Sequence, residues 1–228
     1  VDKIVGPGNI FVALAKRQVF GVVGIDQIAG PTETLLVADD SASPTALAAD
    51  LLAQAEHDPM ATALLITDDA GVAQAVALEV ERQVPLLPRQ EIIRESLRTR
   101  GAAVVAPSIE VAIELANEFA PEHLCLTIRD AWSALPRVRN AGGIFLGERS
   151  IEAIGDYTAG PSHVMPTGGS ARFASPLSAF DFLKLSSVFD VSPGVFRKIS
   201  SAAVALAESE GLEGHAAAIR LRQGDCSG

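Results

Sequence analysis

Short apolar segments alternate with amphipathic segments along much of the chain. The apolar segments predict buried strands at residues 34–38, 63–67, 102–106, 124–128 and 143–146. Between them, apolar residues recur at the spacing of a helix face. This spacing predicts helices at residues 10–19, 43–57, 71–82, 89–100, 109–119 and 132–139. Strands that alternate with such helices are typical of a parallel sheet with helices on both faces, so the pattern predicts an α/β fold.

Capping residues mark the ends of one of these helices. Ser43 is suited to cap the helix at 43–57, and Pro44 is suited to its first turn. Pro59 limits the other end of this helix, because the residue before a proline avoids helical geometry.

The alternating pattern stops at residues 147–174, which are rich in glycine, serine, threonine and proline. Long loops inside compact domains are usually functional. Beyond this loop, Ser192-Pro193 opens a long helix that runs to Glu210, and a last helix follows at 213–222. The C-terminus therefore predicts a helical tail. The phenylalanines of this region are most simply core residues; they are Phe173, Phe180, Phe182, Phe189 and Phe196.

Composition narrows the class of protein. The chain has 228 residues, of which 48% are hydrophobic and 20% charged, values typical of a globular protein. A net charge of −10 argues against binding to duplex nucleic acid, which needs a basic face. No apolar stretch is long enough for a transmembrane helix, and the N-terminus lacks the layout of a signal peptide. These observations exclude the nucleic-acid and membrane classes.

The cysteines indicate a reducing compartment. Cys125 and Cys226 do not form a C-x-x-C motif, so neither a disulfide scaffold nor a cysteine zinc site is expected. We therefore expect a cytoplasmic protein. Because the chain starts at Val1 and not at methionine, we expect a fragment of a longer reading frame.

The chain has four histidines, and the first pairs with an amide. Gln54 and His57 are three residues apart, so a helix would place both on one face, where they could converge on a ligand or a metal. The alternative is that His57 only caps the last carbonyls of the helix.

A second histidine stands beside a carboxylate. Glu122-His123 lies between a predicted helix end and a predicted strand start. Ligands bind at such an edge of an open α/β sheet if the correct end of the strand faces the crevice. Both groups are able to move protons near neutral pH. The alternative is a solvated turn.

The remaining histidines lie in the loop and in the tail. Asp156 and His163 belong to the glycine-rich loop, where Asp156 offers an oxygen ligand and His163 could bind metal or substrate. The alternative is a surface loop with incidental polar residues. His215 follows the acidic residues Glu208, Glu210 and Glu213, which could hold a cation or an amine with it, although a solvated acidic helix end is the simpler interpretation. Two imidazoles together with aspartate and glutamine oxygens would suit zinc.

A glycine turn precedes the first helix. Gly6-Pro7-Gly8-Asn9 could hold a phosphate group at the helix N-terminus. It lacks the third glycine of a dinucleotide fingerprint, so a plain turn is the simpler interpretation.

Long ordered segments together resemble the histidinol dehydrogenase family. The segments are AGPTE at 29–33, LLAQAEHDP at 51–59, FAPEHL at 119–124, FLGERSIEAIGDYTAGPSHVMPT at 145–167 and EGLEGHAAAIRLR at 210–222. The resemblance runs through essentially the whole chain, which is similar to the C-terminal half of the family. It implies an incomplete Rossmann-like sheet with a C-terminal helical tail. Residues 1–31 would end the NAD-binding domain, residues 32–176 would carry most of the site, and residues 177–228 would make dimer contacts.

The resemblance also implies roles for individual residues. Family members oxidise L-histidinol to L-histidine through an aldehyde, with NAD and zinc, as homodimers. The implied zinc ligands are Gln54, His57, Asp156 and His215, with His215 supplied by the partner subunit. His123 would be the base for the alcohol, and Glu122 would activate the water that attacks the aldehyde. The implied substrate contacts are Thr32, His163 and Glu210, together with the four zinc ligands and His123. Asn9 would contact NAD.

Two other functions stay open at this point. A relative in the same superfamily could keep the zinc and the Glu-His pair but oxidise another primary alcohol. Alternatively, the chain could be a truncated module that only binds metal or dimerises.

Overall fold

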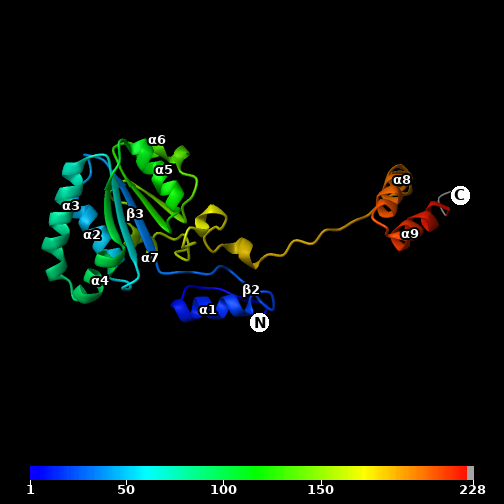
Figure 1. Ribbon diagram of the computed structural model, residues 1–228, viewed down its shortest axis with the longest axis horizontal. Coiled ribbons are helices and arrows are strands. Elements are labelled where there is room, and N and C mark those ends of the chain that lie inside the picture. The colour runs from blue at the N-terminus through cyan, green and yellow to red at the C-terminus, as the bar shows by residue number, and fades with distance from the viewer. Residues whose placement is uncertain (225–228) are drawn as a thin grey trace. The chain divides into compact units, whose positions relative to one another are not determined.

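A computed structural model describes residues 1–224 of the chain, which form two compact units (Figure 1). The first unit runs from Val1 to Phe182, and the second begins at Leu183. The first unit holds a parallel sheet with its helices, and the second holds a pair of helices.

The first unit is built on a five-stranded parallel sheet with the order β5-β4-β3-β6-β7. Its strands are β3 (Glu33–Ala38), β4 (Thr62–Thr67), β5 (Gly101–Val105), β6 (His123–Thr127) and β7 (Gly143–Leu146). The helices between them are α2 (Pro44–Ala55), α3 (Ala70–Gln83), α4 (Gln90–Arg100), α5 (Ile109–Phe119) and α6 (Ala131–Ala134). Short 3-10 helices are η1 (Val84–Leu86), η2 (Leu135–Arg137), η3 (Ser170–Arg172) and η4 (Ala179–Phe182). This architecture confirms the predicted α/β fold.

The central strand β3 is apolar on both faces because helices cover both faces. Leu35 and Val37 pack in a cluster with α5 and α6, whereas Leu36 and Ala38 pack in a cluster with α2 and α3. Figure 1 shows these two groups of helices on opposite sides of the sheet. A strand buried on both faces has a continuous apolar run and not an alternating one, and residues 34–38 have such a run.

Several predicted helix boundaries changed in the structure. Ser43 caps α2 as predicted, with its hydroxyl accepting from the Ala46 N–H. The helix ends at Ala55, however, so His57 lies in the turn that follows. The helix predicted at 132–139 is one short turn, α6, followed by η2, which contains a proline.

The long loop at 147–174 and the phenylalanines also differ from expectation. The loop contains a short helix, α7 (Glu152–Tyr157), which the density of glycine and serine around it concealed. The prediction that the phenylalanines fill the core was wrong, because most of them lie at the surface. The exposed ones are Phe173, Phe180, Phe182 and Phe189. Cys125 is buried in β6, and Cys226 lies outside the described residues.

The N-terminal segment is held by a buried ion pair. It comprises β1 (Lys3–Ile4), α1 (Ile10–Val19) and β2 (Gly24–Ile25), with β1 and β2 parallel. The Lys16 ammonium lies 2.7 Å from the Asp26 carboxylate and also donates to the Gly6 carbonyl, and both charged side chains are almost fully buried. This pair ties α1 to the glycine turn in front of it.

The second unit is a helical hairpin with little core of its own. It contains α8 (Pro193–Ser209) and α9 (Glu213–Gly224), and Gly211 turns the chain between them with a φ of 71°. Leu206 and Leu221 are exposed, as are Leu185, Val188 and Phe189 in the preceding segment. Among the residues that the structure describes, no helix is both long and apolar enough to cross a membrane.

We expect Lys16→Met to loosen the N-terminal segment selectively. Without the ammonium, the Asp26 carboxylate is buried with no cation beside it, a change that typically costs about 3–5 kcal/mol. Hydrogen exchange of the α1 amides should accelerate while the α3 amides keep their protection. Arg98→Met is a matched control because it breaks only an exposed ion pair with Glu95. Unchanged exchange in α1 of the Lys16 variant would contradict this account.

Candidate active site

The candidate site lies at the amino edge of the sheet, where β3 and β6 begin. In their parallel register Thr34 pairs with His123, so the segment entering β3 lies beside Glu122 and His123. The crossover helix α2 runs back against the strand direction, which returns Gln54 and His57 to the same edge. Ligands of open α/β sheets usually bind at the carboxyl ends of the strands, and this site lies at their amino ends, so that tendency does not explain it. At the carboxyl ends of β3 and β6, the Arg129 N–H instead donates to the Asp39 carboxylate at 2.8 Å.

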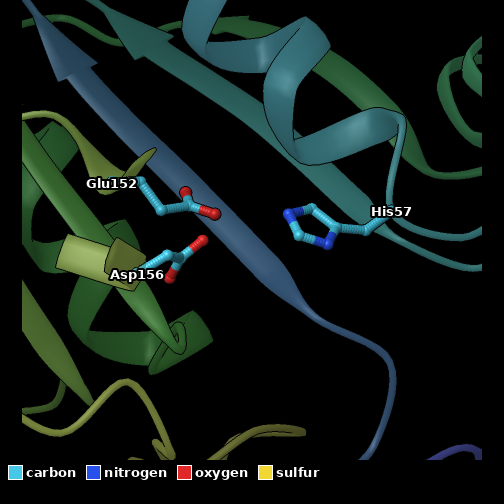
Figure 2. Close-up of side chains that lie close together, drawn as sticks. All are labelled: His57, Glu152 and Asp156. Atoms are coloured by element: carbon cyan, nitrogen blue, oxygen red, sulfur yellow. The ribbon is translucent and has the colours of Figure 1, made fainter. Parts of the chain in front are cut away.

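A cluster of possible metal ligands forms where α2 and α7 meet. His57, Glu152 and Asp156 each offer one ligand atom, and these atoms lie within 4.8 Å of one another. Figure 2 shows the carboxylates of Glu152 and Asp156 on one side, facing the His57 imidazole. His57 and Asp156 belong to the predicted set. Glu152 does not, although the four-residue spacing of the two carboxylates was a signal once a helix was assigned there.

Gln54, also a predicted ligand, joins this cluster through Thr34. The Thr34 hydroxyl lies 3.2 Å from Gln54 Oε1 and also hydrogen-bonds Glu152 Oε2. Gln54 is fully buried, yet its Nε2 has no hydrogen-bond partner within residues 1–224. Reversing the amide lets the nitrogen donate to Thr34 while Thr34 donates to Glu152. The Gln54 oxygen is then left as an acceptor without a protein donor, which is what a metal ligand requires.

Burial strongly affects the Glu152 carboxylate. Loss of water, together with the neighbouring carboxylates of Asp156, Glu122 and Asp50, raises its pKa to about 8 against the effect of the Thr34 hydrogen bond. A concentration of carboxylates of this kind favours a bound cation, because a cation offsets both the desolvation and the mutual repulsion.

Glu122 accepts two hydrogen bonds, and its pKa lies near neutral pH. Its Oε2 accepts from the Thr32 hydroxyl at 2.7 Å and from the Glu33 N–H at 3.0 Å. Burial raises the pKa of Glu122 to about 7 despite these hydrogen bonds. The turn that leads to it is unusual, because Ala120 adopts a left-handed conformation with a φ of 56°.

His123 is fixed in one tautomer. Its Nδ1 lies 3.0 Å from the Glu33 carbonyl oxygen, which can only accept, so Nδ1 carries the proton. Nε2 is buried, has no hydrogen-bond partner among the residues that the structure describes, and therefore presents a free lone pair. Burial lowers the pKa of His123, which keeps the ring neutral. A neutral imidazole with one free nitrogen is suited to act as a base.

Two adjoining cavities bring most of the predicted residues together. The first, of about 310 Å³, holds the metal cluster together with Glu122 and His123. The second, of about 240 Å³, is lined by Asn9 and the glycine turn. Thr32, Glu122 and His163 line both cavities. Asn9 also caps α1, with its Oδ1 accepting from the N–H groups of Phe11 and Val12.

Two predicted residues lie in the other compact unit. Glu210 caps the end of α8, and His215 lies in the first turn of α9. Both are exposed. Their assignment to the site stays a prediction.

Comparison with known proteins finds one family over nearly the whole chain. A model of the family described as histidinol dehydrogenase matches residues 1–223. The chain belongs to the histidinol dehydrogenase family. It is 57% identical over 223 residues to histidinol dehydrogenase of Moorella thermoacetica, covering 98% of this chain and 53% of the relative. It is 53% identical over 225 residues to the protein of that name from Bacillus anthracis, covering 99% and 52%.

The fold gives the same result. A crystal structure of histidinol dehydrogenase from Elizabethkingia anophelis superposes with a TM-score of 0.92 at 39% identity, covering 100% of this chain and 53% of that one. The chain thus spans about half the length of the histidinol dehydrogenases it matches, and it corresponds to their C-terminal half, as predicted.

We expect His57→Ala to weaken binding of Zn²⁺ by about tenfold or more. Even the loss of a residue that only hydrogen-bonds a metal ligand lowers metal affinity by about this factor. Titration against a chromophoric chelator measures the affinity. His163→Ala is the matched control, because His163 lines the same cavity but stands outside the cluster, and it should bind Zn²⁺ normally. Equal affinities for the His57 variant and the unmodified protein would remove His57 from the ligand set.

Proposed function

We propose that the full-length protein oxidises L-histidinol to L-histidine in two NAD-dependent steps, with L-histidinaldehyde between them and zinc in the active site. The observation that carries this proposal is a single cavity that holds both an acid–base pair and a metal cluster. Glu122 and His123 supply the proton chemistry, and His57, Glu152 and Asp156 surround the place for a cation. Family membership supports the same reaction.

The donor set fits zinc. An imidazole nitrogen and carboxylate oxygens are ordinary zinc ligands, and the unpartnered Gln54 amide supplies another oxygen once it is reversed. We assign Gln54, His57 and Asp156 as ligands and Glu152 as the residue that holds Gln54 through Thr34. Bound zinc would supply a fixed charge that holds the nitrogen groups of the substrate. The substrate alcohol would then lie in reach of His123.

His123 acts first. Its Nε2 takes the proton of the substrate hydroxyl while the carbinol carbon is oxidised to the aldehyde. The Glu33 carbonyl keeps Nδ1 protonated throughout, so the positive charge that forms on the ring is partly stabilised by that carbonyl. Bound NAD would supply the hydride acceptor for each oxidation, and Asn9 with the glycine turn that lines the adjoining cavity would hold it.

Glu122 acts in the second oxidation. Water adds to the aldehyde carbon, and the Glu122 carboxylate takes the proton that this water loses. A pKa of about 7 leaves a substantial fraction of Glu122 ionised at neutral pH while keeping it basic enough to accept a proton. His163 and Thr32 border the same space and hold the substrate. Because both steps use one cavity, the aldehyde stays enclosed between them.

The tail of a second copy completes the site. Glu210 and His215 belong to a helical unit whose apolar side chains are largely exposed, including Leu206 and Leu221. A helical hairpin with so much exposed apolar surface needs a partner surface. We assign that surface to another copy of the chain, so that each site combines one body with the tail of the other subunit. The cytoplasm is the compartment we expect for this homodimer.

We expect His123→Ala in the full-length protein to abolish oxidation while zinc content stays unchanged. General base catalysis contributes about 10²–10⁴ in rate, and His123 is not among the cluster residues. Steady-state turnover of histidinol, compared with other primary alcohols, measures the effect. Loss of zinc in this variant would show that its role is wrongly assigned, and no turnover of histidinol by the unmodified protein would overturn the proposed reaction.

We expect two inactive variants to complement each other. His57→Ala damages the body of the subunit, whereas His215→Ala damages only its tail. In a mixed dimer with shared sites, one site carries both changes and the other carries neither. Mixing the two proteins after mild dissociation should therefore restore activity, and mixing two preparations of the same variant should not. If mixing restores nothing while mixed dimers form, each site is built from one chain only.

A further inference from the structure

Glu33 begins β3 and contacts three parts of the site, yet its side chain has no part in the proposed reaction. Its N–H donates to Glu122 Oε2 at 3.0 Å, and its carbonyl accepts from His123 Nδ1 at 3.0 Å. Both contacts use backbone atoms. The side chain of Glu33 makes a separate contact. A substitution at this position therefore changes the side-chain contact and keeps the backbone groups that contact Glu122 and His123.

The Glu33 side chain reaches the loop that carries His163. Its Oε1 accepts from the Gly168 N–H at 3.1 Å. Gly168 and Gly169 have φ values of 61° and 76°, a turn that suits glycine and presents this N–H. The other carboxylate oxygen, Oε2, is buried, and no group in the described part of the chain hydrogen-bonds it.

Further hydrogen bonds join the same two segments. Gln27 Nε2 donates to the Met165 carbonyl at 2.7 Å, and the Gly30 N–H donates to Thr167 Oγ1 at 2.5 Å. Residues 27–33 and 165–168 therefore lie side by side, with the Glu33 carboxylate as the last contact and the only one made by an acidic side chain among these three. His163 directly precedes the buried stretch 164–167.

We propose that Glu33 is a positioning residue that ties the His163 loop to the Glu122–His123 pair. This inference rests on the proposed function for its link to catalysis. One residue fixes the acid–base pair through its backbone and the substrate-side loop through its carboxylate. The acid–base pair and the loop that carries His163 are thus both bonded to a single residue at the start of β3.

The test compares Glu33→Ala with Glu33→Gln in the full-length protein. Glutamine keeps an oxygen that accepts from Gly168, whereas alanine removes the contact. Loss of a charge-assisted hydrogen bond corresponds to about a tenfold effect or more. We expect Glu33→Ala to raise KM for histidinol by about that factor with a much smaller change in kcat, and Glu33→Gln to restore KM.

Hydrogen exchange supplies a readout that needs no substrate. In Glu33→Ala, amides of residues 163–169 should exchange faster while those of α3 are unchanged. Asp39→Ala is the matched control, since Asp39 also accepts a backbone N–H but at the opposite end of β3, and it should leave the loop and KM unchanged. If the loop of Glu33→Ala exchanges faster but the unmodified protein does not turn over histidinol, the proposed reaction is wrong and the structural role of Glu33 stands. Normal loop exchange and normal KM in Glu33→Ala would overturn the tie itself.

Discussion

The parallel register of β3 and β6 is the constraint on which the candidate site depends. Pairing Thr34 with His123 sets Thr32 and Glu33 beside Glu122, so that one backbone segment donates to the acid and accepts from the base. A slip of one residue would turn every side chain of β6 to the other face of the sheet. The apolar clusters on both faces prevent that slip, because β3 and β6 are buried on each side. The core therefore also determines the tautomer of His123.

The amino edge of the sheet also buries several carboxyl groups. Glu122, Glu152 and Glu33 all have raised pKa values, and in each case removal from water is the main cause. Several carboxylates kept close together in a partly dry cavity are unfavourable for folding. Their presence is understandable if the site is arranged around a cation and around proton transfer near neutral pH, where acids with ordinary pKa values would be fully ionised.

The chain also shows how a family can divide one site among several elements. The sheet edge carries Glu122 and His123, and the end of α2 with the short helix α7 carries the side chains that could hold a cation. The glycine turn before α1 closes the neighbouring cavity, held in place by the buried pair of Lys16 and Asp26. The second unit leaves many of its large apolar side chains exposed.

The sequence by itself determined the strands, most of the helices, the family and the residues with suitable chemistry. Periodicity and capping are local, so residues 34–38 and Ser43 could be interpreted without any tertiary information. Only the tertiary structure decided what depends on contacts between distant segments. It placed the site at the amino edge, because α2 runs back along β3, and it turned α7 so that Glu152 faces His57. It also left Phe173 and Phe180 at the surface and gave Glu33 its three contacts. Burial and hydrogen bonds between residues far apart in the sequence cannot be predicted from local spacing.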